Sequence, residues 1–177
     1  MASPGVAAAG IFPAGPEVGT SLPGGRVTDP VQALACLSEA LDFLAHANPA
    51  EWPAGQQADC LRALAVAESR QAAAHARVLS AFSVPGGGLA GDGHRSPRVW
   101  LTWQTAATRR AASYRVSWMH RLNGHPLIGA ALAGGTISVS WAAQIMDWTR
   151  SLPEDVRDDA DAELLSAAAN GAALADL

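Results

Sequence analysis

The chain has 177 residues, enough for a domain with a hydrophobic core, and its formal net charge is -4. Hydrophobic residues make up 49% of it, and many of these are alanine, while aromatic residues make up only 6%. This composition favours closely packed helices and an all-α multi-helix bundle. Two cysteines, Cys36 and Cys60, form no Cys-x-x-Cys pair, so the sequence indicates a reduced, cytoplasmic protein and not a secreted disulfide scaffold.

Charge is divided unevenly along the chain. Residues 61–121 hold nine arginines against two acids, whereas residues 1–60 hold one arginine against six acids, and residues 122–177 hold two against eight. Every one of the 12 basic residues is arginine. A basic centre between acidic ends is typical of a polyanion-binding face, unless folding scatters the arginines over several surfaces.

The first 27 residues are rich in Gly, Pro and Ala without helical periodicity, so we expect a disordered leader at 1–27 ahead of a helical domain at 28–177. Within that domain, Asp29 followed by a proline is a typical helix start, and leucines then recur at intervals of three and four residues. The sequence therefore predicts a helix from Pro30 to about Asn48.

A second, longer helix is predicted at about residues 56–82, and its apolar face carries two polar residues, Glu68 and His75. A carboxylate on such a face costs stability unless it is paired. We therefore expect a buried or half-buried Glu68 that is held by an arginine, with Arg95 and Arg115 as the candidates. The alternative is a catalytic carboxylate.

Two helices separated by a short link are predicted at residues 97–104 and 108–122. Ser96 precedes a proline, which is the pairing expected of an N-cap and a first helical position, and Thr108 opens the next helix. The link Thr-Ala-Ala at 105–107 is short enough to make the two helices pack at an angle. This pattern is an embedded helix-turn-helix-like pair.

The arginines of this pair are the candidate nucleic-acid contacts. Two of them lie in the first turn of the second helix, where a recognition helix reaches base edges, and arginine binds guanine or phosphate with two hydrogen bonds. We expect contacts to double-stranded DNA from Arg98, Arg109, Arg110 and Arg115. The alternative is that the second helix is a core element whose arginines only face water.

Three more helices are predicted, at residues 126–133, from Ser138 or Ser140 to Trp148, and 153–169. The uncharged stretch at 122–146 is long enough to span a bilayer, but proline and a Gly-Gly pair interrupt it, so no membrane segment is expected. Residues 172–177 keep helical character and then stop, and we expect a domain truncated at its C-terminal end.

No residue pattern typical of catalysis, metal binding or cofactor binding is present in the sequence. His120 and His125 are five residues apart, which does not place them on one helix face, and no Cys or acid flanks them at ligand spacing. The glycines at 86–88 are not followed by the Lys-Ser/Thr of a phosphate loop. One helix carries an acidic run that is typical of a solvated face, namely Asp158, Asp159, Asp161 and Glu163.

The tryptophan residues suggest a different function for the domain. Trp52, Trp141 and Trp148 could form an exposed surface that docks a partner or a second copy of the chain, since the last two are seven residues apart and share a helix face. Trp141 and Trp148 could equally be core anchors. A protein-interaction or dimerisation module without nucleic-acid binding is therefore the alternative function.

The order of motifs resembles one known family. Ala67-Glu68 lies in a long helix, Asp92-Gly93-His94-Arg95-Ser96 precedes Trp100-Leu101, an Arg-rich helix follows, and Ala131-Leu132-x-x-Gly135-Thr136-Ile137-Ser138 comes before Ala142-Ala143 and Ile145. Over residues 30–177 this pattern is similar to the domain of unknown function 222, the N-terminal helical region of actinobacterial HNH endonuclease-like proteins, including the 13E12 repeat family. The family usually has a Thr-Gly-Leu-type turn where this chain has Thr105-Ala106-Ala107.

The resemblance implies a non-catalytic helical domain of an HNH endonuclease-like protein, because the family's nuclease activity resides in a C-terminal HNH module that this chain does not contain. No nuclease residue is carried over, and no enzyme activity is expected of this chain alone. The expected partners are double-stranded DNA, a second copy or a downstream nuclease module, and no membrane.

Overall fold

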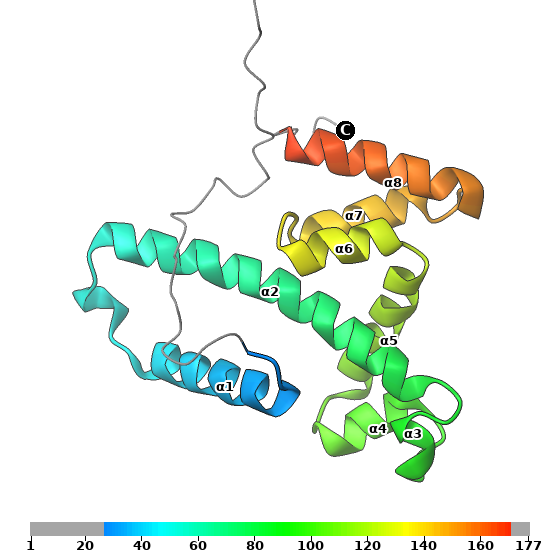
Figure 1. Ribbon diagram of the computed structural model, residues 1–177, viewed down its shortest axis with the longest axis horizontal. Coiled ribbons are helices and arrows are strands. Elements are labelled where there is room, and N and C mark those ends of the chain that lie inside the picture. Colours follow the sequence, from blue (N-terminus) through cyan, green and yellow to red (C-terminus); the bar gives the residue numbers. More distant parts are fainter. Residues whose placement is uncertain (1–26, 171–177) are drawn as a thin grey trace, which may run out of the picture. The chain divides into compact units, whose positions relative to one another are not determined.

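The structure is a computed structural model that describes residues 27–170 (Figure 1). Every regular element in this range is a helix, so the predicted all-α class is confirmed. The expected leader, except for Val27, and the expected helical character of residues 172–177 lie outside the described residues. The chain divides into two compact units whose described parts are residues 27–63 and 64–170.

The first unit contains α1 (Pro30–His46), a short 3-10 helix η1 (Pro49–Glu51) and the beginning of α2 (Ala54–Ser83). The carboxylate of Asp29 accepts a hydrogen bond from the backbone N–H of Val31 at 2.7 Å, which is the cap that the sequence predicted. The side chain of Gln57 donates to the carbonyl oxygens of Pro49 and Trp52, at 2.8 and 3.1 Å, and so fixes the turn into α2.

The apolar stripe of α1 is not covered. No residue of this helix is buried, and its leucines Leu34, Leu37 and Leu41 are 66%, 44% and 45% exposed. A helix of 17 residues is marginal in water without tertiary packing. Within residues 27–63 this surface therefore lacks the contacts that normally stabilise such a helix.

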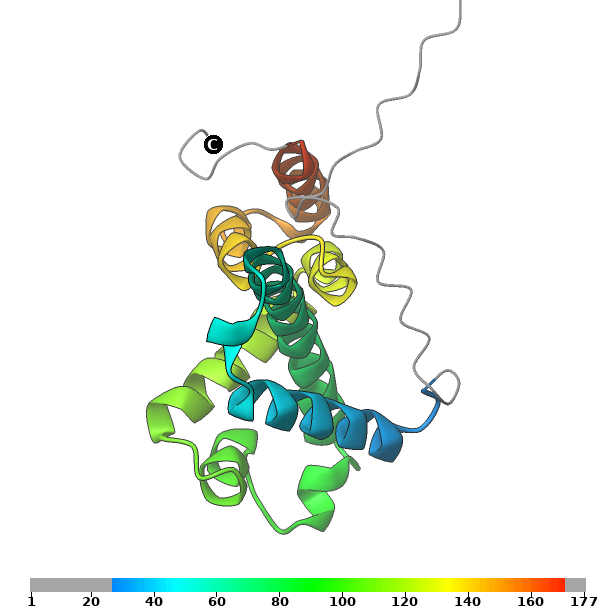
Figure 2. The same ribbon diagram turned by 90° about the vertical axis from the view of Figure 1, so that its left-hand side faces the viewer.

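The second unit contains the rest of α2 and six further helices. These are α3 (Gly88–Gly91), α4 (Pro97–Gln104), α5 (Arg109–Asn123), α6 (Pro126–Gly134), α7 (Val139–Thr149) and α8 (Glu154–Ala169). Of these, only α3 was not predicted. Figure 2 shows α6, α7 and α8 nearly end-on as three helices packed on one another, and α5 packs on both α4 and α6.

The hydrophobic core of this unit lies among α2, α4, α5, α6, α7 and α8. Its fully buried side chains include Ile128, Leu132 and Ile145, and Trp141 is only 8% exposed. Trp141 is thus the core anchor that the sequence allowed, whereas Trp148 is 37% exposed. No helix within residues 27–170 is long and apolar enough to cross a membrane.

The Gly-Gly pair between α6 and α7 has a conformational and a steric role. Gly135 adopts φ +72°, and the N–H of Thr136 donates to the carbonyl of Ala131 at 3.0 Å, which is the bonding of a Schellman motif. A Cβ added to Gly135 would lie 2.6 Å from a methyl carbon of Val66 on α2. Glycine is required here because both the backbone angle and the approach of α2 exclude a side chain.

The turn between α4 and α5 contains an unusual residue. Ala106 has φ +51°, the left-handed region that a Cβ disfavours, while the Thr108 hydroxyl caps α5 by accepting from the N–H of Ala111 at 3.2 Å. The tight turn is therefore made here with alanine, at a cost in backbone strain.

Replacing Ala106 with glycine should relieve this strain. We expect Ala106→Gly to raise the free energy of unfolding by about 0.5–1 kcal/mol, because the left-handed penalty of alanine exceeds the extra chain entropy of glycine. Ala107→Gly is the matched control, since Ala107 packs against the core and has no positive φ, and it should not stabilise the protein. Urea unfolding of both variants measures the difference. Destabilisation by Ala106→Gly would contradict the assignment of strain.

Candidate functional site

A hollow of about 750 Å³ lies in the second unit, and its lining is strongly cationic. It is bounded by the start of α4, one face of α5, the link into α6, the end of α7 and α8. Serines, glycine and apolar residues complete the lining, to which the described residues contribute no carboxylate. The charged or titratable lining residues are Arg98, Arg121, Arg150, Arg157, His120 and His125. We call this hollow the arginine pocket.

Helical periodicity explains how α5 supplies one wall. Its lining residues are separated by one or three positions in turn, so that they share one side of the helix. The opposite side carries buried residues such as Ala112 and Met119, so α5 is also a core element, which was the alternative interpretation of this helix. The residues of the pocket side are Ser113, Val116, Ser117, His120, Arg121 and Gly124.

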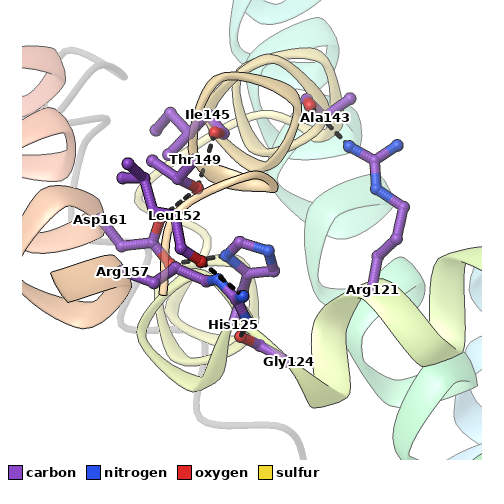
Figure 3. A network of polar contacts seen from close by, with 9 residues as sticks. All are labelled: Arg121, Gly124, His125, Ala143, Ile145, Thr149, Leu152, Arg157 and Asp161. Carbon is purple, nitrogen blue, oxygen red and sulfur yellow. Dashed lines mark hydrogen bonds and ion pairs between the residues drawn. The ribbon is translucent and has the colours of Figure 1, made fainter. Parts of the chain in front are cut away.

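One pocket arginine is neutralised within the protein. Arg121 forms an ion pair with Asp147 at 2.9 Å and donates to the carbonyl of Ala143 at 2.9 Å. Its guanidinium carbon also lies 5.9 Å from the centre of the Trp118 ring, within the range of a cation–π contact. Figure 3 shows this guanidinium directed toward Ala143 and away from His125. Arg121 therefore contributes to the wall but little free charge.

The other three arginines have no anionic partner among residues 27–170. Arg98 and Arg150 are exposed, and neither forms an ion pair there. Arg157 is half-buried, and its terminal nitrogens donate to the carbonyl oxygens of Leu152 at 2.8 Å and Gly124 at 3.4 Å. Its Nε is buried without a hydrogen-bond partner in the described part of the chain. The pocket thus holds three guanidinium groups whose charge no described carboxylate balances.

A buried polar network adjoins the pocket (Figure 3). His125, the residue that precedes α6, is 5% exposed, and its Nδ1 lies 2.7 Å from Oδ2 of Asp161, which is fully buried on α8. The hydroxyl of Thr149, at the end of α7, lies 2.8 Å from Oδ1 of Asp161 and 3.0 Å from the carbonyl of Ile145. Because Nδ1 of His125 contacts Asp161, the ring nitrogen without a hydrogen-bond partner among residues 27–170 is Nε2.

The burial of Asp161 corrects the prediction of a wholly solvated acidic run. Asp158, Asp159 and Glu163 are exposed as expected, but Asp161 shares the inward side of α8 with half-buried Leu164 and Leu165 and buried Ala168. These three residues follow Asp161 at intervals of three, four and seven, which is the periodicity of one helix face, so the sequence contained a signal that Asp161 lies on the buried face. The hydrogen-bond partner of Asp161 could not be predicted from the sequence, since His125 lies 36 residues earlier, at the start of α6.

The structure separates the four predicted DNA contacts. Arg98 lines the pocket, and Arg109 lies four residues before the lining residue Ser113, so it extends the pocket side of α5. Arg110 follows it at the edge of that side. Arg115 lies on the opposite side of α5, near His75 of α2. Arg109, Arg110 and Arg115 are all exposed.

The expectation of a buried Glu68 is not met. Glu68 is exposed on α2, and no ion pair within residues 27–170 includes it, Arg95 or Arg115. The inward side of α2 instead includes Ser69, which is 1% exposed and donates to the carbonyl of Ala65, and half-buried His75. The Glu68 carboxylate stays in contact with solvent, because the inward side of α2 lies one position away, at Ser69.

Metal ligands do not gather in the described part of the chain: no three His, Cys, Asp or Glu side chains in residues 27–170 are arranged as a metal site requires. The comparisons with family models, with curated proteins and with solved structures find no match to this chain. The site is therefore interpreted from its own geometry.

Asp161 should be a major determinant of stability. We expect Asp161→Ala to lower the free energy of unfolding by about 3 kcal/mol, because it leaves the His125 N–H and the Thr149 hydroxyl with poorer partners in a buried place. Asp159→Ala, the same change at an exposed position of the same helix, should shift it by less than about 0.5 kcal/mol. Chemical unfolding compares the two variants, and equal effects would contradict the role of the buried network.

His75 should make stability depend on pH. Burial, together with the positive charge of Arg115, lowers the pKa of the His75 imidazole below its ordinary 6.5. The unfolded chain then binds this proton more readily, so the stability that His75 provides is complete above pH 6.5 and is lost as the pH falls through the lowered pKa. We expect His75→Gln to flatten this part of the stability profile, and Arg115→Gln to reduce its slope. An unchanged profile in His75→Gln would refute the assignment.

Proposed function

We propose that the second unit binds double-stranded DNA without catalysing a reaction, mainly through phosphate contacts from α4 and the first half of α5. The observation that supports this most is the set of exposed arginines without carboxylate partners within residues 27–170. Arg98, Arg109 and Arg110 belong to it, and each stands in the first turn of its helix. A duplex carries one negative charge per about 1.7 Å of its axis, so clustered unpaired arginines are the complementary surface.

The helix-turn-helix-like geometry adds to this proposal. The eight residues of α4 and the fifteen of α5 are joined by a four-residue turn, and the two helices pack together. The N–H groups at the start of α5 point toward the side from which a phosphate would approach, and the helix dipole favours an anion there. Exposed Trp103 and Tyr114 offer apolar contact beside these arginines. The first turn of α5 is the proposed contact region.

The resemblance to the domain of unknown function 222 supplies a context. In that context the chain is the helical, non-catalytic part of an HNH endonuclease-like protein, and it would deliver a downstream nuclease module to DNA. No residue in the arginine pocket is assigned a nuclease role.

A comparison of arginine variants tests the proposal. The double variant Arg109→Ala/Arg110→Ala should weaken binding to a labelled duplex, measured by fluorescence anisotropy, and should reduce the slope of log K against log salt by about 0.9 for each phosphate that is no longer neutralised. The matched control is Arg115→Ala, an exposed arginine of the same helix on its opposite side, which should change little. A wild-type chain without salt-dependent binding, or equally weakened binding in control and double variant, would sink the proposal.

A second function is supported by α1. Its uncovered leucine stripe is the kind of surface that pairs with another helix, so the first unit could act as a dimerisation or protein-interaction module. Light scattering at several protein concentrations distinguishes the two. A dimer that Leu34→Glu/Leu41→Glu dissociates while DNA binding is absent would favour the second function.

A further inference from the structure

We infer that the arginine pocket binds a small organic phosphate with at least two negative charges, of the size of a nucleotide. This inference can be separated from DNA binding, because the open hollow is bounded by α4, α5, the residue after α7 and α8, and of the proposed DNA contacts only Arg98 lines it, whereas Arg109 and Arg110 do not. Pockets for small molecules typically have volumes of roughly 300–1,000 Å³, and this one has about 750 Å³.

The charge of the pocket sets the charge of its ligand. Arg98, Arg150 and Arg157 stand around it without an ion-pair partner among the described residues, whereas Arg121 is satisfied by Asp147. Three guanidinium groups are balanced best by an anion that carries two or more charges and several acceptor oxygens. Phosphate meets this need, since a guanidinium binds it through two parallel hydrogen bonds.

Arg157 is held ready for such a ligand. Two backbone carbonyls accept from its terminal nitrogens, at 2.8 and 3.4 Å, and so hold the guanidinium beside the link into α6. Carbonyl oxygens fix its position but do not cancel its charge. Its buried Nε–H has no acceptor within residues 27–170. A half-buried cation without an anionic partner is costly, and an anionic ligand in the pocket would balance its charge.

His125 offers the ligand a further hydrogen-bonding group. Its Nδ1 is engaged by Asp161, so the nitrogen left for a ligand is Nε2 (Figure 3). A neutral imidazole accepts a hydrogen bond at Nε2, and a protonated one donates there. A phosphate monoester has a second pKa of about 6 and can offer either a P–OH donor or an oxygen acceptor near neutral pH. An ionised carboxylate offers acceptors only.

The hydroxyl groups of the wall complete the recognition. Ser113 and Ser117 lie on the pocket side of α5, and Ser96 lies at the start of α4. Each can donate to phosphate oxygen or to a sugar hydroxyl. The apolar part of the lining, with Val116 and Pro97, suits the non-phosphate portion of an organic ligand. The site is therefore complementary to a phosphate joined to a larger organic group.

Calorimetric titration of the full chain with ADP tests this inference. We expect saturable binding of ADP, weaker binding of pyrophosphate, and no binding of adenosine, which lacks the phosphates. Citrate, a carboxylate anion of similar charge, should bind more weakly than pyrophosphate. Absence of ADP binding at millimolar concentration, or citrate binding as tightly as pyrophosphate, would overturn the inference.

Variants locate the binding. Arg157→Gln and Arg150→Gln should each raise the Kd for ADP by about tenfold or more, since each removes a charge-assisted hydrogen bond. Arg150 is exposed, so its variant decides the question if Arg157→Gln does not fold. Arg115→Gln is the matched control and should leave the Kd unchanged. Equal Kd values for Arg150→Gln and wild type would place ADP elsewhere and refute the site.

The two proposals can fail separately. Arg109→Ala/Arg110→Ala should lose DNA affinity and keep ADP affinity, because neither arginine lines the pocket. A duplex with a 5′-terminal phosphate, compared with the same duplex without it, tests whether the phosphate comes from a DNA end. Preference for the phosphorylated duplex without ADP binding would refute the small-molecule ligand and retain DNA binding.

Discussion

The contact between His125 and Asp161 is the interaction on which the second unit most depends. It joins the start of α6 to the middle of α8, and Thr149 adds the end of α7 to the same carboxylate. A buried carboxylate tolerates few arrangements of its neighbours, because each unsatisfied oxygen would cost stability in a place without water. Nonpolar packing alone would let these three helices slide past one another, and the polar contacts therefore hold them in one register. The same contact fixes the ring of His125 at the edge of the arginine pocket, so the stability of the fold and the geometry of the site have one cause.

The uneven charge of the sequence becomes a local imbalance in the fold. The acids of the last third are numerous, yet the two that directly follow Arg157 on α8, Asp158 and Asp159, are exposed and form no ion pair within residues 27–170. Among the described acids, only Asp147 reaches a pocket arginine. Arg98, Arg150 and Arg157 therefore line one hollow without a described carboxylate to balance their charge. Such a lining is complementary to the anionic ligand that we infer.

Local signals predicted the helices, and tertiary contacts decided the site. Capping residues such as Asp29, Ser96, Thr108 and Ser138 satisfy N–H groups within three residues of themselves, so the sequence was enough to place helix starts. The partner of Asp161 depends instead on how α6 meets α8, and no local rule contains that information. The prediction for Glu68 was wrong in the opposite direction. Its seven-residue spacing from apolar residues of α2 suggested burial, but the inward side of α2 runs through Ser69. Patterns along one helix predict its faces to within about one position, which is too coarse to decide the burial of a single charge.

The arrangement of α5 links the two proposed binding events. Its inward side contributes Ala112, Met119 and Leu122 to the core, and its outer side runs without interruption from the arginines of its first turn to the pocket wall. A rigid helix cannot move one end of this side independently of the other, so an anion bound in the pocket would hold α5 against α7 and α8. A ligand that binds only the folded state stabilises it in proportion to the logarithm of its concentration over Kd. The ligand would thereby neutralise the unpaired arginines of the pocket and stabilise the packing of α5 on its neighbours.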